Sequence, residues 1–236
     1  MAFRRFIRAA CVSTNAIIDV FDRLLKAFGP QHWWPGRTPF EVMVGAILTQ
    51  NTSWKNVEQA IGNLRDSGRF GPFRLHGLPT EELAQLIRPS GYYNLKARRL
   101  QAFLAFFVSR YRGSASRMAA QETSALREEL LAVSGIGPET ADAILLYALG
   151  HPVFVVDAYT RRIFSRLGLA DEDVDYHQLQ ARFLKALPQE ASLYNEYHAL
   201  IVALGKDICR PRPHCAVCPL ITLCPAGKAQ QAGTES

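Results

Sequence analysis

The sequence contains no run of eighteen apolar residues, and no stretch in which apolar and polar residues alternate over the length of a strand. The first absence excludes a membrane span, and the second gives no support to a β-sheet. The amino-terminal stretch also lacks the apolar core of a secretory signal, because Arg8 interrupts it. We therefore expect a cytoplasmic protein that binds no membrane.

Cysteine is scarce except in one short segment, which holds four of the five cysteines. Cys209, Cys215, Cys218 and Cys224 follow the pattern C-x5-C-x2-C-x5-C, and prolines stiffen the intervening loops. Thiols stay reduced in the cytoplasm, so this spacing predicts a metal site rather than disulfides. Ligation by sulfur alone suits either zinc or a [4Fe–4S] cluster. We expect the fifth cysteine, Cys11, to be a plain thiol.

Acidic residues are outnumbered, with 27 lysines and arginines against 21 aspartates and glutamates, and the formal net charge is +6. A basic protein of this kind suits a polyanionic partner. The chain has 236 residues, of which 48% are hydrophobic, so it can bury a core in one large domain or two small ones.

The most informative stretch covers residues 130–166 and reads as helix, glycine turn, helix, apolar connector and helix. Gly135, Ile136 and Gly137 form the turn, since glycine adopts backbone angles that other residues avoid. Pro138 suits the first position of the next helix, and Glu139 favours its positive end. Free backbone N–H groups at such a helix start can bind phosphate.

Asp157 follows an apolar connector, residues 153–156, and precedes a helix. An aspartate in this place is commonly a helix N-cap. It can cap the helix and still direct a carboxylate at a ligand, so both interpretations stay open at this point.

These motifs resemble the helix-hairpin-helix DNA glycosylases of the endonuclease III superfamily, and the resemblance extends over residues 38–224. It rests on the 135–137 turn, on Thr140 and Ala141, and on Asp157 before Arg161 and Arg162. It implies a hairpin that holds DNA phosphate, an aspartate essential for base excision, and a [4Fe–4S] cluster on the four cysteines. The family's first cysteine gap is six residues, whereas here it is five. It also implies a location at the nucleoid if the protein is bacterial.

The resemblance also assigns residues that would probe the duplex and hold the base. Gln50 occupies the loop whose glutamine would fill the gap left by the flipped base. Tyr92 stands where the family places a bulky residue that wedges into the base stack. Trp33, Trp34 and Trp54 are candidates for the wall of the base pocket, although a tryptophan in such a sequence is also a common core residue.

Glu139 occupies the position at which bifunctional relatives carry the lysine that forms a Schiff base with the sugar. A carboxylate cannot form that bond, so we expect a monofunctional glycosylase with weak or absent AP lyase activity. Residues 33–35, 48–52, 88–94 and 137–142 look most like the 3-methyladenine glycosylase branch, and an acidic, tryptophan-walled pocket would favour a cationic alkylated purine. The alternatives are an endonuclease III-like enzyme acting on oxidised pyrimidines, a glycosylase for mismatched uracil or thymine, and a non-catalytic DNA-binding protein.

The expected architecture is all-α and two-lobed, in a monomer that acts on duplex DNA containing a damaged base. Residues 40–150 would form one lobe ending in the hairpin, and residues 1–39 with 151–236 the other, with Asp157 in the cleft. We expect a loop at 113–120 and a disordered tail at 225–236. The helices expected from apolar periodicity and capping residues cover 15–28, 39–49, 54–65, 81–87, 122–133, 158–167, 176–187 and 192–207, with a further helix ending at 110.

Overall fold

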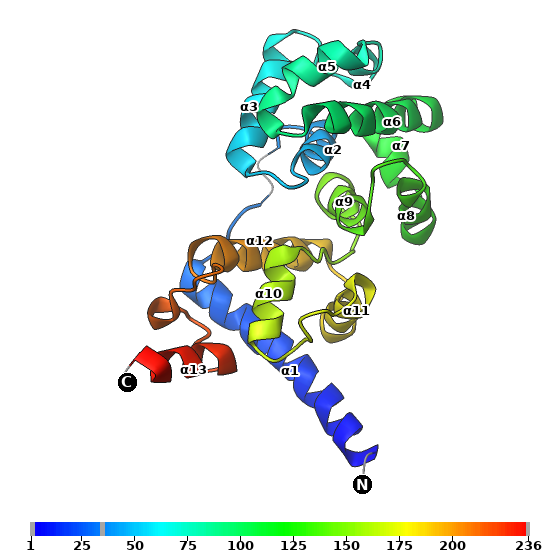
Figure 1. Cartoon of the computed structure of the whole chain (residues 1–236). Coiled ribbons are helices and arrows are strands. Elements are labelled where there is room, and N and C mark those ends of the chain that lie inside the picture. Colours follow the sequence, from blue (N-terminus) through cyan, green and yellow to red (C-terminus); the bar gives the residue numbers. More distant parts are fainter. Residues whose placement is uncertain (1–2, 34–35, 235–236) are drawn as a thin grey trace. The chain divides into compact units, whose positions relative to one another are not determined.

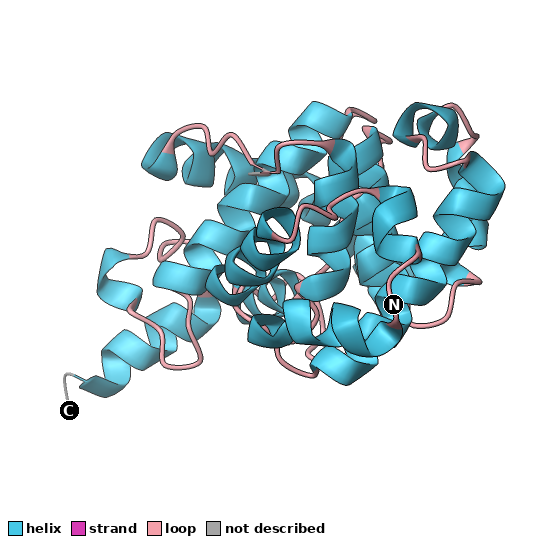
Figure 2. Ribbon diagram, turned by 90° about the horizontal axis from the view of Figure 1, so that it is seen from above, coloured by secondary structure: helices cyan, strands magenta, loops and turns pink. Residues whose placement is uncertain are grey.

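The computed structural model describes residues 3–33 and 36–234, and every regular element in these two ranges is helical (Figures 1 and 2). Figure 2 shows helices joined by short loops, which confirms the all-α class. None of the helices within the described ranges combines the length and apolar character needed to cross a membrane. The chain divides into two compact units.

The first unit contains Met1–Trp33 and Pro152–Ser236. In it, α1 packs against α11 and α12, and α12 packs against α10. The rings of Phe154 and Phe183 stack at the centre, with Tyr197 edge-on to both. The Tyr197 hydroxyl donates to the Ile17 carbonyl at 2.7 Å, so this polar group is satisfied inside the core. The helices are α1 (Phe3–Phe28), α10 (Ala158–Arg166), α11 (Tyr176–Ala186), α12 (Ala191–Asp207), η3 (Cys215–Val217) and α13 (Pro225–Thr234).

The second unit contains Trp34–His151 and is built around α2. Every residue of α2 from Phe40 to Leu48 is buried, as expected of a helix whose only charged residue is Glu41. It contacts α3, α6, α9 and η2. The elements are α2 (Pro39–Leu48), α3 (Trp54–Asp66), α4 (Pro72–His76), α5 (Thr80–Leu86), η1 (Arg88–Ser90), α6 (Tyr93–Tyr111), α7 (Ala115–Ala119), α8 (Thr123–Leu131), α9 (Pro138–Ala143) and η2 (Ile144–Ala148), the last a π-helical turn.

Three expectations about the elements were wrong. The first helix begins at Phe3 rather than at residue 15, because neither proline nor glycine interrupts the preceding residues. The expected loop at 113–120 contains α7, which Ser114 caps by accepting from the Arg117 N–H. The expected disordered tail contains α13, because its alanines, glutamines and lysine favour a helix and it packs against α10 and η3.

Candidate functional site

The turn between α8 and α9 is anchored by a buried side chain and flanked by exposed glycines. Ile136 is only 5% exposed, and its N–H donates to the Val133 carbonyl at 3.1 Å inside the turn. Gly135, at φ +86°, and Gly137 present exposed backbone on either side. The Ile136 side chain therefore fixes the turn from within, and any phosphate contact would fall to the backbone beside it.

A paired charge braces the two helices of this hairpin. Arg127 on α8 donates to both carboxylate oxygens of Asp142 on α9, at 2.6 and 3.1 Å. Asp142 is completely buried, and Arg127 is 21% exposed. A bidentate pair of this kind fixes direction as well as distance, so the angle between α8 and α9 is held firmly.

Gln50 and Tyr92 lie on two loops of the second unit that share an unusual backbone conformation. Asn51, next to Gln50, has φ 53°, and Tyr92 itself has φ 45°. Left-handed backbone is uncommon outside glycine, and it clusters where function fixes a conformation. Tyr92 is 72% exposed at the start of α6, so its ring is presented to solvent rather than packed in the core.

Lys96, in the first turn of α6, binds backbone just before each of these two loops. It is 1% exposed, and its Nζ donates to the Leu48 carbonyl at 2.9 Å and to the Ser90 carbonyl at 2.6 Å. Burial, reinforced by the charge of Arg99, lowers the pKa of Lys96 to about 8. The sequence interpretation overlooked Lys96 because a lysine in a basic stretch usually lies on a solvated face.

Asp157 caps α10 with one carboxylate oxygen and leaves the other outside the cap. Its Oδ1 accepts from the Thr160 N–H at 2.8 Å and from the Thr160 hydroxyl at 2.9 Å. Its Oδ2 lies 3.5 Å from Nε2 of His198 on α12. Burial by itself would raise the pKa of Asp157, but the His198 imidazole and the Thr160 hydrogen bonds outweigh it and hold that pKa below its ordinary value. The group is therefore a carboxylate at neutral pH.

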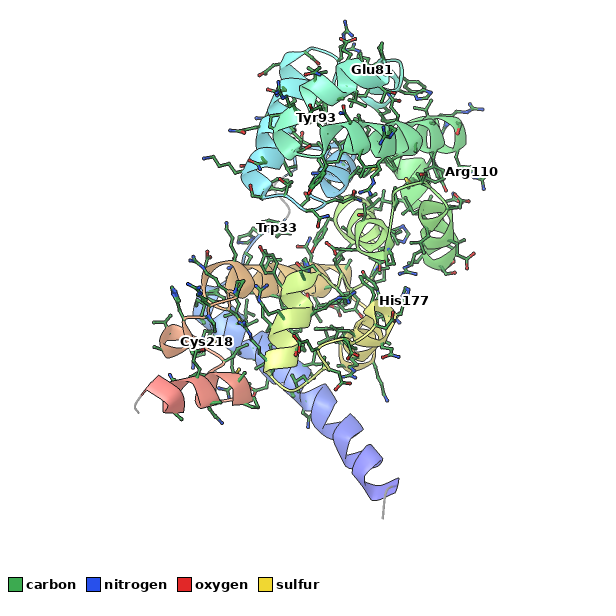
Figure 3. All side chains as sticks on the ribbon, viewed as in Figure 1. Trp33, Glu81, Tyr93, Arg110, His177 and Cys218 are labelled. Atoms are coloured by element: carbon green, nitrogen blue, oxygen red, sulfur yellow. The ribbon has the colours of Figure 1, made fainter. Side chains whose placement is uncertain are left out.

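The tryptophans assigned to the base pocket have different surroundings. Trp33, labelled in Figure 3, is half-buried at the end of the first unit's amino-terminal segment. Trp54 begins α3 and lines a cavity of about 260 Å³ together with Arg37, Glu41, Glu58 and Arg65. Glu41 is buried and paired with Arg65, so the charges around Trp54 are balanced rather than acidic. Trp34 lies outside the described residues.

All four carboxyl-terminal cysteines line one cavity of about 200 Å³ in the first unit, and Figure 3 labels Cys218 among them. The Gly227 N–H donates to Cys224 Sγ at 3.3 Å, and an Arg166 Nη1–H donates to Cys209 Sγ at 3.3 Å. A Cβ added at Gly227 would lie 3.5 Å from Cys224 Sγ and 2.8 Å from the Ile221 side chain, so glycine leaves room at the wall. The sequence motif therefore folds into a thiol-lined cavity.

Each unit holds its own share of the residues singled out from the sequence. The second unit brings together the hairpin turn, Gln50 and Thr140: the Gln50 Nε2 group donates to the Gly135 carbonyl at 3.1 Å and to the Thr140 hydroxyl at 2.9 Å. Glu139 lies exposed beside them in the first turn of α9. The first unit holds Asp157 and the cysteines, and it adds His198, which no local motif marks because its partner is distant in sequence.

The chain matches the HhH-GPD family, described as the HhH-GPD superfamily of base excision DNA repair proteins, over residues 44–189. A Methanocaldococcus jannaschii protein named as a candidate DNA repair glycosylase is 48% identical over 210 residues, covering 88% of this chain and 95% of the relative.

Two solved structures share the fold at appreciable sequence identity. A non-covalent endonuclease III–DNA complex has a TM-score of 0.80 at 27% identity, and the match covers 93% of this chain and 98% of that one. Helicobacter pylori 3-methyladenine DNA glycosylase bound to 1,N6-ethenoadenine has a TM-score of 0.69 at 31% identity and covers 84% of this chain and 97% of that one. The protein therefore belongs to the HhH-GPD superfamily and is a DNA repair glycosylase related to endonuclease III.

Proposed function

We propose that this glycosylase is monofunctional and hydrolyses the N-glycosidic bond of an alkylated purine, such as 3-methyladenine, in duplex DNA. The observation that carries the proposal is the Asp157 carboxylate, which is mostly buried yet held in its ionised form. Breaking the glycosidic bond develops positive charge on the sugar. A fixed carboxylate stabilises that charge and can orient the attacking water.

The two oxygens of Asp157 would divide the work. Oδ1 is committed to Thr160 and fixes the carboxylate at the start of α10. Oδ2 faces His198 rather than the helix and is the oxygen that would meet the sugar or the water. The cap thus supplies orientation without removing the negative charge.

Glu139 supports both the monofunctional reaction and the choice of substrate. By resemblance, this position carries the Schiff-base lysine of bifunctional relatives, and a carboxylate has no amine to attack the sugar. Its exposed charge would also attract a cationic alkylated base. The Helicobacter pylori relative, a 3-methyladenine DNA glycosylase, is 31% identical to this chain, which favours the same substrate class.

Duplex DNA would be held through its backbone and probed through two loops. The exposed backbone at Gly135 and Gly137 suits a phosphate, Gln50 would fill the vacated position in the duplex, and Tyr92 would wedge into the stack. The likeness to two endonuclease III structures that contain DNA supports this partner. We propose that the protein acts on DNA as a monomer.

The four thiols that line the cysteine cavity fit a [4Fe–4S] cluster, and Cys209, Cys215, Cys218 and Cys224 would be its ligands. Ligation by sulfur alone also suits zinc. The resemblance to the endonuclease III superfamily favours the cluster. The cluster's role would be structural.

An endonuclease III-like reaction on oxidised pyrimidines is the second candidate. It is favoured by the TM-score of 0.80 to endonuclease III–DNA structures, one of which is a trapped covalent intermediate. A non-catalytic binder is disfavoured by Asp157, because a carboxylate near DNA repels phosphate and contributes nothing to simple binding.

Duplexes that each contain one lesion, either a 3-methyladenine analogue or thymine glycol, separate the two candidates. Each would be incubated with the protein and then analysed with and without alkali, and in parallel with borohydride. We expect excision of the alkylated base, strand breaks only after alkali, and no borohydride-trapped adduct. Breaks at thymine glycol without alkali, together with a trapped adduct, would establish the endonuclease III-like reaction instead.

The variant Glu139→Lys tests whether position 139 is where bifunctional relatives carry their Schiff-base lysine. Restoring an amine at this position should produce a borohydride-trapped adduct that the wild type does not form. Glu128→Lys is the matched control, because Glu128 is an exposed glutamate on α8 and the charge change is the same. Trapping by neither variant would show that position 139 does not face the sugar.

A further inference from the structure

The Gln50 side chain is engaged at both ends of its amide. Its Nε2 group donates to the Gly135 carbonyl at 3.1 Å and to the Thr140 hydroxyl at 2.9 Å, while its Oε1 accepts from Arg99 Nη1. Turning the amide over would place its NH2 group against the guanidinium and its oxygen against a carbonyl. The partners therefore fix the orientation of the amide as well as its position.

Arg99 also packs directly on the hairpin turn. A Cβ added at Gly135 would lie 2.2 Å from Arg99 Cγ and 2.7 Å from its Cδ. The stem of Arg99 thus lies over the Gly135 backbone, and its guanidinium reaches on to Gln50. Arg99, on α6, therefore contacts both the hairpin turn and Gln50 within the second unit.

We propose that Arg99 is a positioning residue for Gln50, holding its amide against the hairpin turn before DNA binds, so that docking of the hairpin delivers Gln50 to the duplex. The proposal rests on the proposed role of Gln50 in filling the vacated position. A free glutamine side chain loses rotamer entropy when it is ordered. Arg99 orders the Gln50 side chain before DNA binds, so less rotamer entropy is lost on binding.

A double-mutant cycle tests this coupling. Single-turnover excision would be measured for the wild type, Arg99→Met, Gln50→Ala and the double variant, on the duplex that the lesion panel identifies. Methionine keeps the stem over Gly135 and removes the donors to Gln50. We expect Arg99→Met to slow excision about tenfold, and to change the rate less than about twofold when Gln50 is already alanine. Arg99→Lys, which keeps one charged donor, should restore part of the rate.

Arg98→Met is the matched control, because Arg98 is the exposed neighbour on the same helix and loses the same charge. We expect it to excise at the wild-type rate. The unfolding temperature of each variant separates coupling from general destabilisation. A loss of excision by Arg99→Met that is equal in both backgrounds would overturn the proposal, as would faster excision, which would identify a restraint rather than a support.

A binding measurement keeps this test independent of the lesion. The same four proteins would be titrated with a duplex containing a tetrahydrofuran abasic analogue and with an intact duplex, at several salt concentrations. We expect Arg99→Met to reduce the preference for the abasic duplex only while Gln50 is present. A salt dependence reduced by about one phosphate contact, whatever residue stands at position 50, would instead make Arg99 a phosphate ligand and overturn the positioning role. Because this binding cycle uses no lesion, it still tests the coupling between Arg99 and Gln50 if the lesion panel identifies no substrate.

Discussion

At the residue scale, Asp157 is both a helix cap and the proposed catalytic carboxylate. One substitution separates these two roles. Asparagine caps a helix about as well as aspartate but carries no charge. We therefore expect Asp157→Asn to stay folded, with a small loss of stability because the attraction to His198 is gone, and to keep its affinity for an abasic duplex while excision falls by roughly 100-fold or more. Single-turnover kinetics and fluorescence anisotropy measure the two effects.

Asp175→Asn is the control for this substitution. Asp175 caps α11 by accepting from the His177 and Gln178 N–H groups, so the change in capping chemistry is the same. It carries no assigned role in excision, and its variant should excise at the wild-type rate. Undiminished excision by Asp157→Asn would remove Asp157 from the reaction.

Lys96 makes a prediction about pH. Its pKa is lowered to about 8 in the folded chain and returns to about 10.4 when the chain unfolds. Between these values the unfolded chain binds more protons, so the contribution of Lys96 to the free energy of unfolding rises with pH. Below about pH 8 both states are charged, and the desolvation cost of Lys96 is present in full.

Lys96→Met provides the reference, because methionine matches the stem and does not titrate. From about pH 7 to pH 9.5 we expect the wild type to gain on the order of 1–2 kcal/mol relative to the variant, as measured by urea unfolding. Excision by the variant should fall, since the Leu48 and Ser90 carbonyls lose their donor. A stability difference that stays constant with pH would show that Lys96 keeps its proton throughout.

The sequence predicted the candidate residues that local patterns mark and missed those defined by distant partners. The helix after Asp157 and the four-cysteine motif were predictable because the relevant groups are neighbours in the chain. His198 and Arg99 carry no such mark. Their significance depends on contacts with Asp157 and Gln50 that form only when the helices pack.

At the scale of elements, the Arg127–Asp142 pair should stabilise the angle between helices α8 and α9 of the hairpin. Removing Arg127 takes both guanidinium hydrogen bonds from the buried Asp142 carboxylate, and breaking a buried pair costs about 3–5 kcal/mol. We expect Arg127→Met to lower the free energy of unfolding by that amount in urea titrations. Adding Asp142→Leu to the same variant should recover much of the loss, since no buried charge then remains.

The exposed pair of Arg110 and Glu129 is the control for the hairpin brace. Arg110 is 62% exposed, so Arg110→Met should change stability by less than about 1 kcal/mol. If Arg127→Met were equally mild, water would be solvating the Asp142 carboxylate, and the pair would not set the hairpin angle.

The sequence predicted helices well where capping residues and an apolar face occur together. It predicted them poorly where tertiary packing or intrinsic propensity decides whether a helix forms. Helices such as α3 and α11 have amphipathic faces that their sequences display. By contrast, α13 is polar and contains glycine, features that also suit a disordered tail. Its contacts with α10 and η3, close to the cysteines, supply the order that its composition leaves undecided.

For the whole molecule, the proposed cluster connects the carboxyl-terminal end to the helix that Asp157 caps. Arg166 on α10 donates to Cys209 Sγ at 3.3 Å and to the Pro211 carbonyl at 3.0 Å. Burial raises the pKa of the Cys215 and Cys218 thiols, so these groups would remain neutral without a cation to compensate their charge. Iron would supply that compensation and close the cysteine loop against α10.

Replacing one ligand should therefore affect both colour and stability. We expect Cys224→Ser to lose the visible absorption and bound iron of the cluster, and to lower the unfolding temperature by roughly 5–10 °C. Excision should fall with it, because the loop that Arg166 binds loses its closure. Cys11→Ser removes the one cysteine outside the motif and should retain colour, iron and activity. Zinc in place of iron in the purified wild-type protein would contradict the proposed cluster. A colourless Cys224→Ser variant with an unchanged unfolding temperature would show that the cluster does not stabilise the fold.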